Sequence, residues 1–67
     1  MKCNMRAERI RAGLSAGEVG KHINRSAHSV LLYETGKVDP PGTVLIGLSK
    51  LYDKEIDYLM ADSSDRN

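Results

Sequence analysis

The chain has 67 residues, of which 40% are hydrophobic and 28% are charged, and it contains a single cysteine. A chain of this length buries only about 60% of the surface that its unfolded form exposes, so most large apolar side chains are needed for the core. Length and composition therefore predict one small domain, and the lone cysteine excludes an internal disulfide. Because no apolar run approaches the roughly 18 residues of a membrane span and no signal peptide is visible, we expect a cytoplasmic protein with no membrane partner.

Charge is distributed unevenly along the chain, although its net value is only +1. Residues 1–38 hold seven lysines and arginines against three glutamates, a net +4, whereas residues 39–67 hold three basic against six acidic residues, a net −3. This asymmetry is expected if one end of the domain faces phosphates, and ordinary surface charge explains it equally well.

Helical spacing begins near the N-terminus. Residues that suit one helix face recur there at intervals of three and four. Gly13 suits the left-handed backbone conformation of the residue that follows a helix end. The residues at these intervals are Met5, Arg9, Ile10 and Leu14. We predict a first helix over residues 3–12.

A capping box predicts where the second helix begins. The Ser15 hydroxyl can accept a hydrogen bond from the backbone of Glu18, whose carboxylate can reach back to the Ser15 N–H. Val19 and Ile23 then supply a buried stripe, so we predict a helix over residues 16–22.

A third helix is expected after a tight turn. Asn24 tolerates the positive φ of such a turn, Ser26 is a good N-cap and Gly36 supplies a stop. Gly20 is small at the point where the second and third helices are expected to approach each other. The residues spaced to face inward are Val30 and Tyr33. We predict this helix over residues 27–34.

The remaining chain reads as a loop, two more helices and a tail. Residues 37–42 contain two prolines and a glycine, which predict a loop. Helical spacing then resumes with one break, predicting helices over 43–52 and 55–60 and a polar, flexible tail over 61–67. The apolar positions are Leu45, Leu48, Leu51 or Tyr52, Ile56 and Leu59. No segment favours a strand, so we expect an all-α domain over residues 1–60.

The tight turn between the second and third helices is expected to leave the third helix exposed at the protein surface, where it can enter the major groove of DNA. Four motifs then carry a family resemblance when taken together at their spacing. They are Arg9-x-x-x-Gly13-Leu14-Ser15, Val30-x-x-Tyr33-Glu34-x-Gly36-Lys37, Leu48-x-x-x-Tyr52 and Ile56-Asp57-x-Leu59. Over residues 5–60 the chain resembles the Cro and phage-repressor (Xre-like) family of helix-turn-helix regulators.

The resemblance implies a compact five-helix repressor-like domain that binds double-stranded DNA sequence-specifically as a transcriptional regulator, without a cofactor. Its recognition helix is then the one over 27–34. The family pairs an arginine of the first helix with the glutamate that ends the third, and the matching residues here are Arg9 and Glu34. A buried pair of this kind is structural, because losing one member strands a charge.

By family position, the recognition helix offers mostly methyl groups to DNA. The candidate base contacts are Ala27, His28, Leu31 and Leu32. The candidate phosphate contacts are Ser15, Ala16, Arg25, Ser26, Ser29, Thr35 and Lys37. The family often has glutamine, arginine or lysine at base-reading positions, since these side chains pair with purine edges, so we expect weak specificity. His28 is the best polar reader, although a surface histidine without a DNA role fits equally well.

Leu31 and Leu32 cannot both be buried if Val30 and Tyr33 face inward. Three explanations stay open: contact with a thymine methyl group, a protein partner that covers the helix, or a rotated helix that buries one leucine.

One such domain contacts only a few base pairs, so we expect a homodimer on a palindromic operator. Tyr58 and Met60 are the candidate interface residues, and edge-of-core packing accounts for them equally well.

Other function classes find less support. No phosphate loop, metal-ligand spacing or nucleophile with a matching base is present, so we expect no enzyme. Cys3, His22 and His28 are too scattered in sequence to predict a zinc site, so no metal is expected. The main alternative is a protein-interaction module, antirepressor or antitoxin-like, that keeps the fold but has lost base reading.

Overall fold

The computed structural model describes residues 4–61, which form five α-helices and no strand. The helices are α1 (Met5–Arg11), α2 (Ala16–Ile23), α3 (Ala27–Thr35), α4 (Gly42–Tyr52) and α5 (Ile56–Met60). The predicted all-α, five-helix fold class is confirmed, and each helix end lies within two residues of its predicted position. Apart from Ala61, the predicted tail lies outside the described residues.

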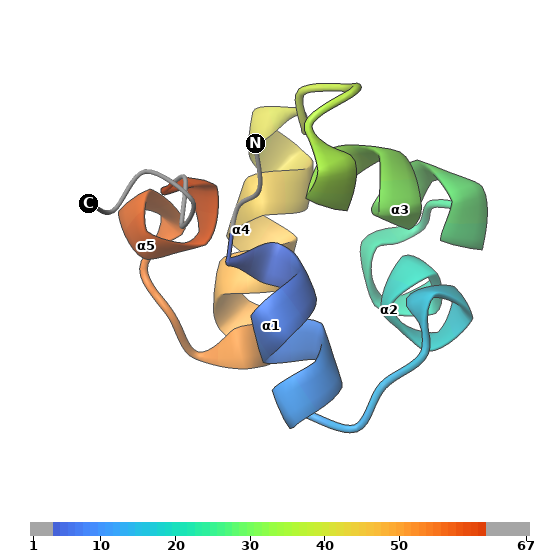
Figure 1. Cartoon of the computed structure of the whole chain (residues 1–67), viewed down its shortest axis with the longest axis horizontal. Coiled ribbons are helices and arrows are strands. Elements are labelled where there is room, and N and C mark those ends of the chain that lie inside the picture. The colour runs from blue at the N-terminus through green and yellow to red at the C-terminus, as the bar shows by residue number, and fades with distance from the viewer. Residues whose placement is uncertain (1–3, 62–67) are drawn as a thin grey trace.

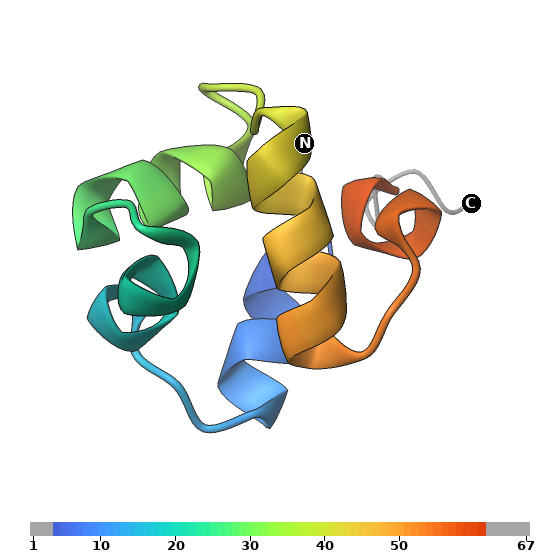
Figure 2. The same ribbon diagram turned by 180° about the vertical axis from the view of Figure 1, so that it is seen from behind.

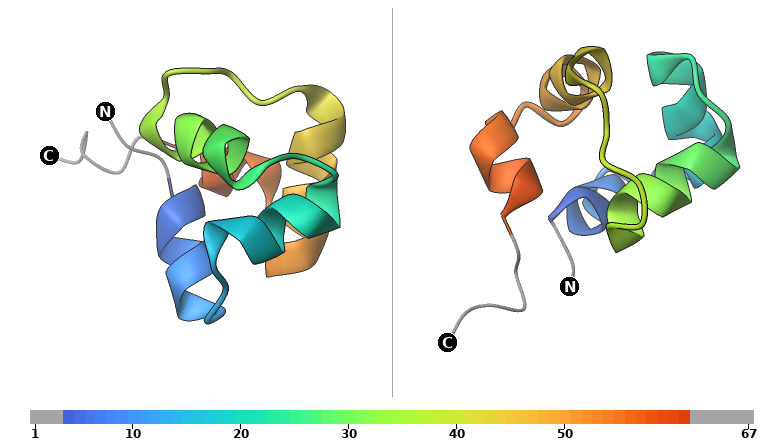
Figure 3. Two further views of the ribbon diagram at one scale, coloured as in Figure 1. Left: turned by 90° about the vertical axis from the view of Figure 1, so that its right-hand side faces the viewer. Right: turned by 90° about the horizontal axis from the view of Figure 1, so that it is seen from above.

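The helix-turn-helix stands at one side of the molecule. In Figure 1, α2 and α3 occupy the right-hand side and α5 the left, with α1 and α4 between them, and Figure 2 shows the same order from behind. Helix α2 packs against α3 and α4, and α5 packs against α4. When the right-hand side is turned toward the viewer, α2 and α3 lie in front and α5 behind (Figure 3, left). A partner approaching from that side therefore meets α2 and α3 first.

One apolar core joins the helices. Its members are Met5, Val19, Ile23, Val30, Tyr33, Val44, Leu48, Tyr52 and Leu59. The inward positions predicted on the second and third helices are among them, and Tyr52 rather than Leu51 takes the inner position near the end of α4. A fully buried side chain of this size contributes about 1.5–3 kcal/mol, so the core is the main source of stability in so short a chain.

The turn between α2 and α3 is fixed by two residues. Asn24 has φ 59°, the left-handed conformation expected from the sequence. The small size of Gly20 is explained by the backbone of the turn rather than by the approach of α3. A Cβ on Gly20 would overlap the Arg25 carbonyl oxygen and lie 3.3 Å from the carbonyl carbon of Ser26. The turn can therefore fold tightly over α2 only because this position lacks a side chain.

Helix α1 departs from the sequence prediction. Ile10, one of the residues at helical spacing, is 55% exposed, whereas Glu8 is buried. The burial of Glu8 is explained by its partners. The Tyr58 hydroxyl of α5 donates to Glu8 Oε2 at 2.7 Å, and Arg11 Nε lies 3.3 Å from Glu8 Oε1. A buried carboxylate with these partners is satisfied, which apolar periodicity alone does not reveal.

Further hydrogen bonds tie α5 to the start of α1. The Asn4 side chain donates to the Tyr58 carbonyl oxygen at 2.7 Å, and the Asn4 N–H donates to the Leu59 carbonyl oxygen at 3.1 Å. The Tyr58 hydroxyl lowers the pKa of Glu8, and the Glu8 carboxylate raises the pKa of Tyr58. The pair is therefore most stable when Glu8 is ionised and Tyr58 is neutral.

Replacing Tyr58 by phenylalanine is expected to lower the melting temperature by several degrees near pH 7, because Glu8 loses its hydroxyl donor. The pKa of Glu8 is lowered in the folded chain, so the contribution is present above the ordinary glutamate pKa of about 4. It is lost as the pH falls through the lowered, folded value. Thermal unfolding followed by circular dichroism between pH 7 and pH 2 should therefore show the wild-type and Tyr58→Phe curves converging on acidification.

Tyr52→Phe is the matched control for this comparison. Within the described part of the chain, the buried Tyr52 hydroxyl has no hydrogen-bond partner, so its removal should leave stability unchanged or slightly improved. Equal losses in the two variants, or a Tyr58→Phe loss that does not change with pH, would contradict the assigned role of Glu8.

Candidate nucleic-acid interface

The start of α2 presents backbone N–H groups to one side of the molecule. Its capping box is formed: the Ser15 N–H donates to Glu18 Oε1 at 2.8 Å, and the Glu18 N–H donates to the Ser15 hydroxyl at 3.1 Å. The bond from the Ser15 N–H lowers the pKa of Glu18. Because these groups are occupied, the N–H groups of Ala16 and Gly17, which have no partner inside the helix, are the ones left for a phosphate. Sequence reasoning named Ala16 but missed Gly17.

The start of α3 is capped in the same region. The Ser26 hydroxyl accepts from the Ser29 N–H at 3.1 Å and donates to the Ser29 hydroxyl at 3.2 Å. Both serines are candidate phosphate contacts from the sequence. The Ser26 hydroxyl is committed to the cap, so Ser29 retains the free hydroxyl hydrogen and the α3 N-terminus offers its first backbone N–H groups.

Three basic side chains are exposed along the helix-turn-helix. Lys21, Arg25 and Lys37 are exposed on α2, on the turn and after α3. Arg25 Nη1 donates to the Asn24 carbonyl oxygen at 3.0 Å, which holds its guanidinium beside the turn. The Thr35 hydroxyl, another candidate phosphate contact, donates instead to the Leu32 carbonyl oxygen at 3.2 Å within its own helix. The Thr35 hydroxyl is therefore used within its own helix, and the three exposed cations outnumber the one exposed carboxylate of the helix-turn-helix, that of Glu18.

One carboxylate of the helix-turn-helix, that of Glu34, is removed from the surface by pairing, whereas that of Glu18 stays exposed. Glu18 caps its own helix, and Glu34 is buried beneath α3 in a bidentate contact with Arg9. Arg9 Nε donates to Glu34 Oε2 at 2.7 Å, and Arg9 Nη2 donates to Glu34 Oε1 at 3.1 Å. The carboxylate raises the pKa of Arg9, which stays charged. A third bond runs from Arg9 Nη1 to the Leu14 carbonyl oxygen at 3.1 Å, so one guanidinium holds both the loop before α2 and the end of α3.

Tyr52 lies close to this pair. Burial raises the pKa of Tyr52 to about 12, and the negative charge of Glu34 adds to the effect. The phenol therefore stays neutral beside the charged pair. Sequence reasoning placed Tyr52 in a helical pattern without predicting that it lies near this pair.

The four candidate base contacts lie on the outer part of α3. Ala27, His28 and Leu31 are exposed, and Leu32 is half-buried. Leu31 is 44% exposed. Val30 and Tyr33 are buried, so α3 is not rotated in the way that one explanation of the paired leucines requires.

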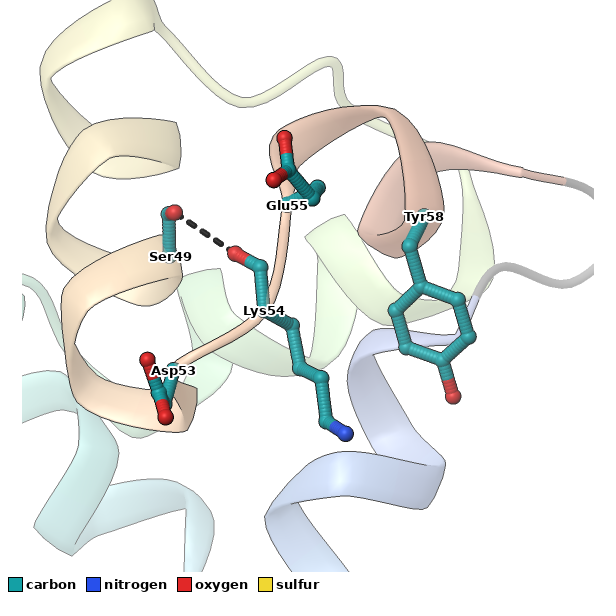
Figure 4. Close-up of a pocket in the computed structure, with 5 residues that line it drawn as sticks. All are labelled: Ser49, Asp53, Lys54, Glu55 and Tyr58. Atoms are coloured by element: carbon teal, nitrogen blue, oxygen red, sulfur yellow. Dashed lines mark hydrogen bonds between the residues drawn. The ribbon is translucent and has the colours of Figure 1, made fainter.

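The candidate dimer residues are both 38% exposed on α5. Tyr58 is partly engaged within the chain, because its hydroxyl bonds to Glu8 and Lys54 Nζ lies 5.9 Å from the centre of its ring. Figure 4 shows Lys54 and Tyr58 beside a pocket that Ser49, Asp53 and Glu55 also line, and the Ser49 hydroxyl donates to the Lys54 carbonyl oxygen there at 2.6 Å. The hydroxyl of Tyr58 is therefore engaged within the chain, whereas its ring and the Met60 side chain are exposed to the same extent, and both stay candidates for an interface.

Between residues 4 and 61, no three side chains of histidine, cysteine, aspartate or glutamate gather as metal ligands. Cys3 lies outside the described residues. No helix within the same span is long and apolar enough to cross a bilayer.

Comparison with known proteins then identifies the arrangement. A family model described as a helix-turn-helix domain matches residues 3–54. The chain belongs to this family. A solved structure, described as the crystal structure of the P22 c2 repressor protein in complex with synthetic operator 9T in the presence of Tl+, is similar to this helix-turn-helix domain with a TM-score of 0.80. It shares 28% sequence identity, covering 85% of this chain and 86% of that chain. A comparison with curated proteins finds no match. The predicted relationship to the Cro and phage-repressor type is thus confirmed.

The Arg9–Glu34 pair gives a direct prediction. Arg9→Ala removes the ion-pair partner of the buried Glu34 carboxylate, whose side chain is 3% exposed, so it should cost about 3–5 kcal/mol of the free energy of unfolding. Arg6→Ala is the matched control on the same helix, because Arg6 is exposed and its loss should cost about 0.5 kcal/mol or less. Urea unfolding followed by circular dichroism measures both.

A double variant separates charge burial from packing. Arg9→Met combined with Glu34→Leu removes both charges, so it should recover most of the stability lost in Arg9→Ala. A loss of less than about 1 kcal/mol in Arg9→Ala would show that the pair does not constrain the fold.

Proposed function

We propose that this chain is a DNA-binding transcriptional regulator of the repressor type, which places the outer surface of α3 in the major groove of double-stranded DNA. The observation that carries the proposal is the helix-turn-helix itself, in which the first backbone N–H groups of α2 and α3 are left for phosphates and the lysines and arginine at positions 21, 25 and 37 are exposed. Helix N-termini and flanking lysines or arginines are the groups that bind a phosphate backbone. The related P22 c2 repressor structure contains operator DNA, which supports the same partner here.

The geometry supports the following roles. The backbone N–H groups of Ala16 and Gly17, together with Arg25 and Lys37, bind phosphates on either side of α3 and fix its register. The exposed His28 donates to a base edge or a neighbouring phosphate. Phosphate contacts dominate this account, so affinity should depend steeply on salt and specificity should be modest.

We further propose that two copies bind a palindromic operator. A single α3 reaches only a few base pairs, and a symmetric pair doubles the contact at a spacing of about one helical turn. Met60 and the outer edge of Tyr58 provide an apolar patch on α5 for this pairing. The helix-turn-helix and α5 lie at opposite sides of the domain, so pairing through α5 leaves α3 uncovered (Figure 1).

Selection from randomised duplex DNA at two salt concentrations tests the proposal. We expect enrichment of an inverted repeat, two chains per bound duplex by analytical ultracentrifugation, and an affinity that falls steeply with salt. Lys37→Ala should weaken binding to all sequences alike and reduce the salt slope by about 0.9 for each phosphate that the lysine neutralises. Lys50→Ala, an exposed lysine on α4, is the control and should change neither quantity.

Absence of enrichment together with a flat salt response would contradict the regulator. A chain that binds no duplex but forms a stable complex with a protein through α3 would favour the interaction module, for which the exposed Leu31 is the supporting observation.

A further inference from the structure

The recognition surface of α3 lacks the side chains that read purine edges. Ala27–Thr35 has the sequence AHSVLLYET, which contains no asparagine, glutamine, arginine or lysine. These are the residues that form paired hydrogen bonds with adenine or guanine in the major groove. Base reading from α3 must therefore use other chemistry.

The hydroxyl groups of Thr35 and Ser29 offer little to a base. Thr35 donates to the Leu32 carbonyl oxygen, and Ser29 is half-buried and accepts from the Ser26 hydroxyl, which leaves its own hydroxyl hydrogen for a phosphate at the start of the helix. His28, by contrast, has no side-chain hydrogen bond to any other described residue and is exposed. One imidazole is therefore the main polar group that α3 can offer to a base.

The rest of the outer surface is apolar and arranged in two rows. Residues four apart lie on the same helix face, so Ala27 and Leu31 form one row and His28 and Leu32 form the next. Val30 and Tyr33 anchor the opposite face in the core, which fixes both rows toward the outside. Leu32 is half-buried, so its side chain is held in place by its neighbours while its outer edge stays accessible.

We propose that Leu31 and Leu32 are specificity-determining residues that read the 5-methyl groups of thymine. The methyl group of thymine is the apolar feature on the major-groove edge of the standard base pairs, and apolar side chains contact it. This inference rests on the proposed function, because it requires α3 to lie in the major groove. Leu32 provides the fixed contact near His28, and Leu31 extends the methyl-reading surface along the helix.

Deoxyuridine substitution tests the proposal without changing base pairing. In the duplex that selection enriches, each thymine of a half-site is replaced in turn by deoxyuridine, which lacks only the 5-methyl group. At the contacted positions, affinity should fall about fourfold per methyl group, the amount expected from losing burial of one methyl. Thymines outside the half-site provide the internal control.

A second substitution separates the methyl group from the base pair that carries it. A contacted thymine–adenine pair is replaced by cytosine–guanine, and then by 5-methylcytosine–guanine. The methyl group of 5-methylcytosine occupies the same position in the groove, so it should restore about fourfold of the affinity that is lost on going to cytosine.

Protein variants assign the contact to a residue. Leu32→Ala should weaken binding to the thymine duplex and abolish the effect of deoxyuridine at one position, and Leu31→Ala should do so at a neighbouring position. Ile46→Ala is the matched control, because Ile46 is a 51% exposed aliphatic residue on α4. It should bind like wild type and keep the full deoxyuridine effect. Circular dichroism melting verifies that each variant is folded.

The outcomes distinguish this inference from the function on which it rests. Sequence-specific, salt-dependent binding with no deoxyuridine effect at any thymine, or a selected half-site without thymine, overturns methyl reading and leaves the regulator standing. A deoxyuridine effect that persists unchanged in both leucine variants also overturns it. Failure to bind any duplex overturns both proposals together.

Discussion

The bidentate contact between Arg9 and Glu34 is the constraint on which the placing of the recognition helix depends. Arg9 is anchored on α1, Glu34 lies near the end of α3, and the third bond of Arg9 holds the carbonyl of Leu14 just before α2. One side chain thus fixes both ends of the helix-turn-helix relative to the rest of the domain. A buried pair of this kind contributes little net stability, so its value lies in orientation: any shift of α3 would separate two buried charges.

Glu8, the residue beside Arg9, links α1 to α5 at the opposite end of the molecule. Glu8 accepts from the Tyr58 hydroxyl on α5, while Arg9 pairs with α3. Two consecutive residues of α1 therefore contact the two helices that the proposed function uses. Arg9 contacts α3, which is proposed to bind DNA, and Glu8 contacts α5, which is proposed to pair two copies of the chain. Both contacts rely on a charged group that is buried and fully satisfied, which gives this small domain a specific geometry in addition to its apolar core.

The helices could be predicted from the sequence because their ends carry local chemistry. The Ser15–Glu18 capping box, Asn24 and Gly36 each act within a few residues, and the structure has the expected cap or left-handed conformation at each. The contact of Glu8 could not be predicted, because its partner Tyr58 is 50 residues away and a lone glutamate in a helix gives no signal of burial. The N-cap role of Ser26 was predicted and is present, but the role of Thr35 was beyond sequence reasoning. Whether a hydroxyl faces a partner or bonds within its own helix depends on backbone geometry that residue type alone does not reveal.

The central claim is that the outer side of α2 and α3, held by Arg9 and Glu34, is the surface that meets DNA. Amide chemical shifts of the ¹⁵N-labelled protein, recorded while duplex DNA is added, test it most directly. The account predicts that the largest changes occur at Ala16, Gly17 and residues 27–32, with smaller changes in α1. Largest changes confined to α5 and the pocket of Figure 4, with α3 unperturbed in a bound complex, would contradict it.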